Sequence, residues 1–273
     1  MKKWLICVLA ALLAASASAC SLMRFTTTEE QRQKEESARK LAQAAEYVSP
    51  QDALLGSLTY ERRLVNAEGS ELARYFASVP KFSEEGARSQ IFERINDFYE
   101  AEYSAFEDDC AVFFDFVKKS YGDGDEWASI SVPSAPARSR FDYQILSGPE
   151  NYISVERTYV NENGGKREIY YYSDVFLADS GWRIGLNDIF GENTDKAYEL
   201  IRKELTDWCL GRNIPTDRAA AINVENFKRS FSIDSSFVTI YTEPFTFSLD
   251  DGESHVIQIP ISVFEGLFAE QLR

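Results

Sequence analysis

The chain has 273 residues, with 44 acidic and 29 basic side chains and a formal net charge of −15 at pH 7. A surface this acidic repels nucleic acid and anionic lipid headgroups and attracts cationic partners at low salt, so we exclude nucleic-acid binding as a function. A simpler reading, that the acidity keeps an exported protein in solution, stays open. His255 is the single histidine, which excludes H-E-x-x-H zinc sites and multi-histidine metal clusters, and we expect neither a metal nor another cofactor.

The first 19 residues have the pattern of a secretory signal peptide. Lys2 and Lys3 precede an apolar run over residues 4–13, and small residues then lead to Ala19 and Cys20. The apolar run is too short to span a membrane. We therefore expect an exported protein with a signal peptide at 1–19.

Two kinds of processing compete at Cys20: cleavage before this residue with lipidation of its thiol, or ordinary cleavage after an A-x-A site. Cys7 leaves with the signal peptide, so lipidation of Cys20 would leave Cys110 and Cys209 as an even pair. The cysteine count thus favours a lipoprotein, anchored to a bacterial membrane on its periplasmic or extracellular face.

The mature chain is predicted to begin with a lipid-anchored polar tether over residues 20–56, which is rich in Glu, Gln, Lys and Ala and lacks a wide apolar face. The folded part is expected as two closely joined halves, 57–190 and 191–273. Their fold class is α+β, an antiparallel sheet with helices packed against it.

The N-terminal half starts with a short strand near 58–65 and a weaker strand at 72–79. Between Glu84 and Tyr121, apolar residues recur at steps of three to five, which predicts a long amphipathic helix. Its stripe is rich in aromatic residues, and we interpret it as core packing and not as a ligand groove. A loop follows over residues 122–139.

The segment 141–190 is the centre of the predicted sheet and contains four strands. Apolar and polar residues alternate over 153–159 and again over 169–177, as in half-buried strands. Asn161 to Gly165 supplies residues that tolerate positive φ and predicts a hairpin turn, and Asp179 to Gly181 predicts the next reversal. An antiparallel arrangement follows.

The C-terminal half is predicted to open with a helix that begins at Asn193 or Thr194 and ends at Gly211. Ser262 and Glu265 form a capping-box pattern for a short terminal helix. Between the two helices we expect three strands, at 237–241, 245–249 and 256–261.

Cys110 and Cys209 fall on the two long predicted helices. If both helices pack on the same side of the sheet, a disulfide between these residues is expected in an oxidising compartment. Two buried free thiols are the alternative.

Little catalytic chemistry can be assigned from the sequence. No G-x-S-x-G motif accompanies His255, and neither of the mature domain's cysteines has a neighbouring base or a C-x-x-C partner. Paired carboxylates could in principle hydrolyse a glycan, but the sequence does not identify a pair. We therefore expect no enzymatic activity, with an envelope glycan hydrolase as the alternative.

Three aromatic residues form the candidate partner-binding surface: Tyr170, Tyr172 and Trp182. On a strand, Tyr170 and Tyr172 point to the same side, where they could bind a sugar or a protein partner. If a helix instead covers these rings, the chain is better interpreted as a structural lipoprotein without a dedicated ligand.

The order of elements resembles a known envelope module. The hairpin at Gly164-Gly165, the motif D-x-G-W-R-I-x-L-N-D-I-F at 179–190 and V-I-Q-I-P-I-S-V-F at 256–264 are similar to the paired domains of unknown function in the extracellular part of the anti-sigma-V factor RsiV. The same module forms the N-terminal part of the peptidoglycan deacetylase PdaC. The resemblance covers residues 57–273, but Lys166-Arg167 follow the paired glycines where the family often has Ala-His.

The resemblance implies a noncatalytic binding domain on the outer side of a membrane. In the anti-sigma member this module binds lysozyme, a cationic protein, and an acidic surface suits such a partner. The expected partners are therefore the cell membrane, through the lipid anchor, and either a lysozyme-like protein or a peptidoglycan-related glycan of the cell wall. Signalling and deacetylation do not carry over, because the chain has neither a cytoplasmic anti-sigma segment nor a deacetylase domain.

Overall fold

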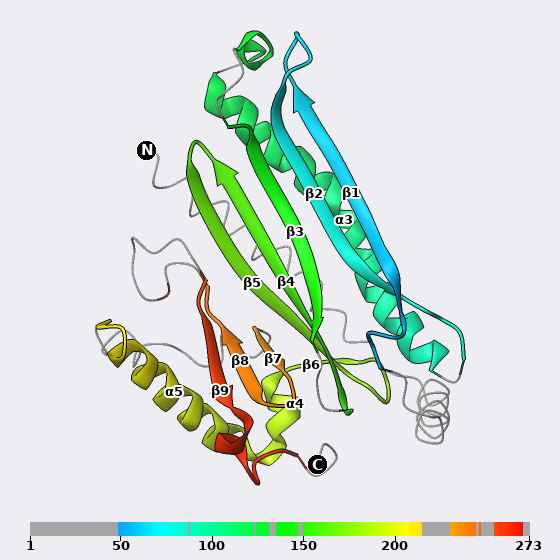
Figure 1. Ribbon diagram of the computed structural model, residues 1–273, viewed down its shortest axis with the longest axis vertical. Helices are drawn as coiled ribbons and strands as arrows, with labels where there is room; N and C mark the ends of the chain where they lie inside the picture. Colours follow the sequence, from blue (N-terminus) through cyan, green and yellow to red (C-terminus); the bar gives the residue numbers. More distant parts are fainter. Residues whose placement is uncertain are drawn as a thin grey trace. The chain divides into compact units, whose positions relative to one another are not determined.

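The computed structural model describes residues 49–86, 88–122, 124–130, 135–146, 150–214, 230–243, 246 and 254–269 (Figure 1). The predicted signal peptide, Cys20 and most of the tether lie outside these residues. Among the helices described, none combines the length and the apolar character that a membrane crossing needs.

A six-stranded sheet forms the larger part of the described fold, with strand order β1-β2-β3-β4-β5-β6. Neighbouring strands are antiparallel, except that β2 and β3 run parallel and are joined through the long helix α3. A parallel pair needs such a crossover connection. The elements are β1 (Leu54–Val65), β2 (Glu71–Phe82), α3 (Ser89–Tyr121), the 3-10 turn η1 (Glu126–Ser129), β3 (Ala137–Leu146), β4 (Tyr152–Asn163), β5 (Lys166–Leu177) and β6 (Arg183–Ile184).

Helix α3 covers one face of this sheet. Its buried residues include Ile95, Tyr99 and Phe106, which share one hydrophobic cluster with strand residues such as Tyr75 and Phe176. The predicted amphipathic helix and its role in the core are therefore confirmed. Where Gly181 passes the start of α3, a Cβ atom would lie 2.6 Å from the carbonyl oxygen of Ile91.

The β4–β5 hairpin turns where the glycines predicted it. Gly164 and Gly165 have φ angles of 58° and 77°, and Asn163 pairs with Lys166 across the two-residue turn. Two successive positive φ angles match the right-handed twist of the strands, and glycine adopts them without steric cost.

The second part of the fold builds its own core on the opposite face of β4 and β5. On β5 the neighbours Val175 and Phe176 belong to different clusters, because successive side chains of a strand point to opposite faces. Ser154 Oγ donates a hydrogen bond to the carbonyl of Ile233 at 2.8 Å, which ties β4 to the smaller sheet. This sheet has the order β7-β8-β9. The elements are α4 (Leu186–Phe190), the 3-10 turn η2 (Gly191–Asn193), α5 (Thr194–Leu210), β7 (Phe231–Ile233), β8 (Phe237–Tyr241), β9 (Val256–Pro260) and the 3-10 turn η4 (Ile261–Phe264).

The predicted α+β class, with helices packed against antiparallel sheet, is confirmed. The short strand β7 was not predicted. The predicted terminal helix after Ser262 is wrong over the described residues 262–269: the 3-10 turn η4 forms there instead, and Gly266, with a φ of 77°, departs from helical geometry two residues after it. The strand expected at 245–249 lies, apart from Thr246, outside the described residues.

The predicted disulfide is not formed, because Cys110 and Cys209 are free, buried thiols. Cys110 belongs to the core between α3 and the six-stranded sheet, whereas Cys209 on α5 belongs to the second core. The condition for the disulfide, that both helices pack on the same side of the sheet, is therefore not met. Burial raises the pKa of the Cys110 thiol to about 11 and also raises that of Cys209.

Candidate partner-binding surface

A row of aromatic rings crosses β3, β4 and β5 on the face of the sheet that carries α3. Phe141 lies opposite Tyr159 with ring centroids 4.7 Å apart, and Tyr159 lies opposite Tyr170 at 5.5 Å. Tyr172 continues the row along β5, its ring parallel to that of Tyr170 with centroids 6.5 Å apart. We call Tyr159, Tyr170 and Tyr172 the tyrosine ladder.

The tyrosine ladder is half-buried, neither sealed in the core nor fully in solvent. Burial is the main cause that raises the pKa of each of the three phenols, that of Tyr172 to about 12. The hydroxyls are therefore protonated throughout the physiological pH range. The ladder thus offers neutral hydroxyls and aromatic ring faces that are partly desolvated.

Carboxylates from three different elements act on the ladder. Asp109 of α3 and Glu168 of β5 both raise the pKa of Tyr159, and Glu243, which follows β8, raises that of Tyr172. The hydroxyl of Tyr170 donates a hydrogen bond to Glu168 Oε2 at 3.2 Å. The carboxylates therefore favour a cationic group over the rings of Tyr159 and Tyr170. At Tyr172 the charge of Arg157, its neighbour on β4, lowers the pKa and opposes a cation.

The ionised form of Asp109 is itself disfavoured by its surroundings. Partial burial raises the pKa of this carboxyl, and the neighbouring acids Glu102 and Asp108 raise it further. Besides burial, the charge of Asp109 also raises the pKa of Tyr75 of β2, which is 2% exposed and whose hydroxyl has no hydrogen-bond partner among the described residues. Helical periodicity placed Asp109 on α3 but gave no signal that it would meet Tyr75 and the ladder.

A buried ionic network lies next to the ladder and fixes α3 to the sheet. Asp174 of β5 is fully buried and contacts Arg157 Nε at 2.9 Å and Arg183 Nη2 at 2.7 Å. Arg157 also pairs with Glu102 of α3 at 2.9 Å, and the hydroxyl of Tyr99 donates to Asp174 at 3.3 Å. Two arginines and two acids balance, so these charges are internally compensated and we interpret the network as structural.

Trp182 does not join the ladder. It follows β5 and is 43% exposed, and the guanidinium of Arg94 lies 4.1 Å from the centre of its ring. Its carbonyl accepts a hydrogen bond from the amide of Leu177, five residues beyond Tyr172 and so about 17 Å along the strand. The structure therefore brings together Tyr170 and Tyr172 from the predicted surface but not Trp182.

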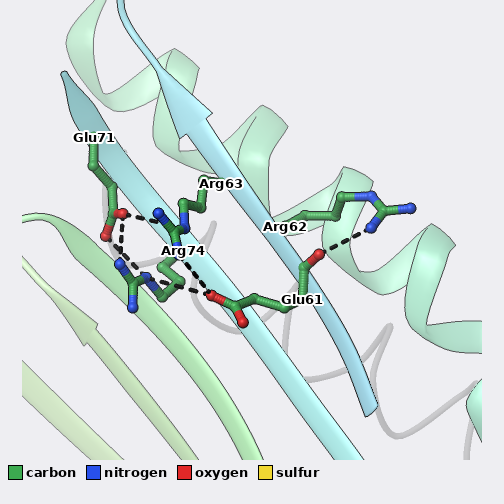
Figure 2. Close-up of polar contacts among 5 residues, drawn as sticks. All are labelled: Glu61, Arg62, Arg63, Glu71 and Arg74. Carbon is green, nitrogen blue, oxygen red and sulfur yellow. Dashed lines mark hydrogen bonds and ion pairs between the residues drawn. The ribbon is translucent and has the colours of Figure 1, made fainter. Parts of the chain in front are cut away.

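A second charged cluster lies on the β1–β2 hairpin, on the sheet face away from α3 (Figure 2). Glu71 is bound by Arg74 at 2.8 Å and approached by Arg63 at 3.7 Å, and Glu61 approaches both arginines. Arg62 points elsewhere and lies 4.7 Å from the centre of the Tyr60 ring. Because this network is partly exposed and charge-balanced, we interpret it as a brace of the hairpin.

Within the described part of the chain, no group of three or more His, Cys, Asp or Glu side chains is arranged to hold a metal ion. His255 packs its ring against Trp208, with centroids 5.0 Å apart, and its amide donates to Thr242 Oγ1. It lies just before β9, next to the core.

The comparisons with known proteins place the fold. No protein-family profile matches the sequence, and no curated protein matches it. Among solved structures, a member of the DUF3298 family from Bacteroides fragilis NCTC 9343 is similar with a TM-score of 0.50 and 13% identity, over 80% of this chain and 94% of that one. A DUF3298 family protein from Pseudomonas aeruginosa PAO1 gives a TM-score of 0.47 and 11% identity over the same shares. The fold is thus that of a domain of unknown function, and the likeness extends to the fold alone.

Proposed function

We propose that the protein is an exported envelope lipoprotein whose folded domain is a noncatalytic binding module for a cationic protein of the lysozyme type. The observation that carries this proposal is the tyrosine ladder with carboxylates from three elements around it. A lysine or arginine of the partner would lie over a ring face while its charge pairs with a carboxylate. Once Lys2 and Lys3 leave with the signal peptide, 27 basic and 44 acidic residues remain, and this net charge of −17 would speed the encounter.

The proposed complex depends both on packing against the tyrosine rings and on the positive charge of the partner. Its affinity should therefore depend less on salt than nonspecific electrostatic attraction does. Titration of the full chain, solubilised in a nonionic detergent, with lysozyme should give saturable binding that persists at physiological salt. A noncognate basic protein of similar charge is the control and should bind only at low salt. Equal binding of the two proteins, or binding that vanishes with salt, would contradict a specific surface.

A peptidoglycan-related glycan is the second candidate, favoured by the parallel rings of Tyr170 and Tyr172, whose planes differ by 1°. A half-buried, stacked pair of tyrosine rings can pack its outer face against the apolar face of a sugar ring. Titration of the protein with chitotetraose, in the absence of lysozyme, would distinguish the two candidates. A glycan site would bind chitotetraose, whereas a site specific for lysozyme would not. In both cases we expect no turnover, so reducing ends should not accumulate when the protein is incubated with peptidoglycan.

A further inference from the structure

The parallel pairing of β2 and β3 stops halfway along the strands. Residues 73–77 of β2 pair with 137–141 of β3, and beyond this point the two strands diverge (Figure 1). Ser78 Oγ still donates a hydrogen bond to the carbonyl of Phe141, at 3.3 Å. From there on, the sheet is split between its second and third strands.

The sequence of β2 explains why the pairing stops. The amide of Ser83 donates to the carbonyl of Ala53 on the β1 side, so Phe82 and Pro80 direct their backbone groups to the opposite side, toward β3. Pro80 has no N–H to donate there. The N–H and C=O of Phe82 are both bound by the side-chain amide of Asn96, each at 2.9 Å. At Pro80 and Phe82 the edge of β2 that faces the split therefore offers no free N–H.

The opposite edge, on β3, lacks a partner strand beyond Phe141. The side chain of Tyr143 does reach β1, where its hydroxyl lies 3.0 Å from the carbonyl oxygen of Gly56 and 2.7 Å from Ser57 Oγ. Asn163 and Lys166 close the two-residue β4–β5 turn, so the odd-numbered residues of β4 bond to β5 and the even-numbered ones bond to β3. On β3, Tyr143 and Ile145 pair with odd-numbered residues of β4 and so direct their N–H and C=O groups toward the split. The ladder between β2 and β3 ends at Phe141, and within the described ranges no turn or loop hydrogen bond joins these four groups.

A groove of about 500 Å³ opens beside this free edge, which we call the β2–β3 groove. Its lining comes from β1, β2, β3 and the residue Gln51 before β1, and it combines hydroxyl and amide groups with two aromatic and two aliphatic side chains. The lining includes Ser57 and Thr59 of β1, Phe76 and Ser78 of β2, and Gln144 of β3. Asp142 also lines it but is paired with Arg140. The groove thus mixes polar groups with a larger apolar surface, and the charge of the acid in its lining is compensated.

We propose that the β2–β3 groove binds an extended, uncharged peptide segment of a partner protein, which adds to the free edge of β3 as a further strand. An extended peptide supplies the alternating donors and acceptors that Tyr143 and Ile145 lack, while pockets beside the edge accept alternate side chains. A strand edge with unpaired N–H and C=O groups is a template for pairing with another chain. Here the split between β2 and β3 limits such pairing to one position. A glycan would contact the hydroxyl and aromatic lining but has no means of extending the ladder.

The proposal is independent of the tyrosine ladder, which lies on the other face of the sheet, and it can be tested with defined probes. Seven-residue peptides displayed on phage are selected on the full chain in detergent, and the best binder is synthesised. Thr59→Trp, an exposed residue inside the groove, should weaken this peptide at least tenfold. Val65→Trp is the matched control: Val65 is 43% exposed on the same strand but outside the groove lining, and its substitution should leave binding unchanged. Thermal unfolding of both variants verifies that each folds.

Two readouts distinguish strand addition from other modes of binding. Hydrogen exchange should slow at the amides of Tyr143 and Ile145 when the peptide is bound. N-methylation of the peptide at alternate residues should abolish binding in one register and leave it within threefold in the other. The proposal would be overturned if the selection gave no peptide whose binding is weakened by Thr59→Trp. So would unchanged exchange at both amides, or displacement of the peptide by chitotetraose together with tolerance of N-methylation in both registers.

Discussion

The buried carboxylate of Asp174 should contribute strongly to the free energy of unfolding. Asp174→Asn keeps the shape of the side chain but removes the negative charge that two arginines share. The side chain of Arg157 is 12% exposed and would keep only Glu102, whereas Arg183 is 27% exposed and can turn toward water. Breaking a buried pair in this way costs about 3–5 kcal/mol. Since 1 kcal/mol lowers the Tm of a domain of this size by about 2–4 °C, the expected drop is about 6–20 °C.

The assay is urea and thermal unfolding followed by circular dichroism, with two control variants. Asp207→Asn removes a helix-surface pair with Lys203 whose side chains are 54% and 65% exposed, and it should cost less than about 1 kcal/mol. The double variant Arg157→Met with Asp174→Leu replaces the pair by apolar groups and should recover most of the loss. If Asp174→Asn lowers the free energy of unfolding no more than Asp207→Asn does, the conclusion that the Asp174 network fixes α3 to the sheet is refuted.

The remaining predictions concern the thiols, Asp109 and the glycines. Cys110 and Cys209 should resist a thiol reagent in the folded protein and react after denaturation without prior reduction; a need for reductant would show that they are bonded. Because burial raises the folded-state pKa of Asp109, its contribution to stability is greatest at low pH and is lost as pH rises through that pKa; Asp109→Asn should therefore raise Tm at pH 7 and have little effect near pH 3, and the reverse dependence would contradict its placement. Gly181→Ala should destabilise more than Gly69→Ala, which costs about 1 kcal/mol: both have positive φ, but only at Gly181 does a Cβ meet a backbone oxygen, so equal losses of Tm would show that α3 does not pass so close.

The sequence predicted those parts of the fold that are encoded locally. The paired glycines 164 and 165 placed the β4–β5 turn, and the period of apolar residues placed α3 and its buried stripe. Alternation placed Tyr170 and Tyr172 on one face of β5, where they stack. In each case the deciding interactions lie within a few residues along the chain.

The errors arose where distant segments meet. The disulfide prediction was conditional on the two long helices sharing one side of the sheet, and this depends on how the two halves pack together and not on local sequence pattern. Trp182 was grouped with the tyrosines by proximity in sequence, yet an extended strand separates them. The split between β2 and β3 follows from Pro80 and Asn96 acting together, and the sequence alone does not reveal that they meet.

The most direct test of the proposed binding surface compares single variants in the lysozyme titration at physiological salt. Tyr170→Ala removes a ring from the middle of the ladder and should weaken binding by about tenfold, corresponding to about 1.4 kcal/mol. Trp182→Ala removes an exposed ring outside the ladder and should leave the affinity within about twofold. Equal affinities for wild type and Tyr170→Ala, or a larger loss with Trp182→Ala, would contradict the assignment of the tyrosine ladder as the binding surface.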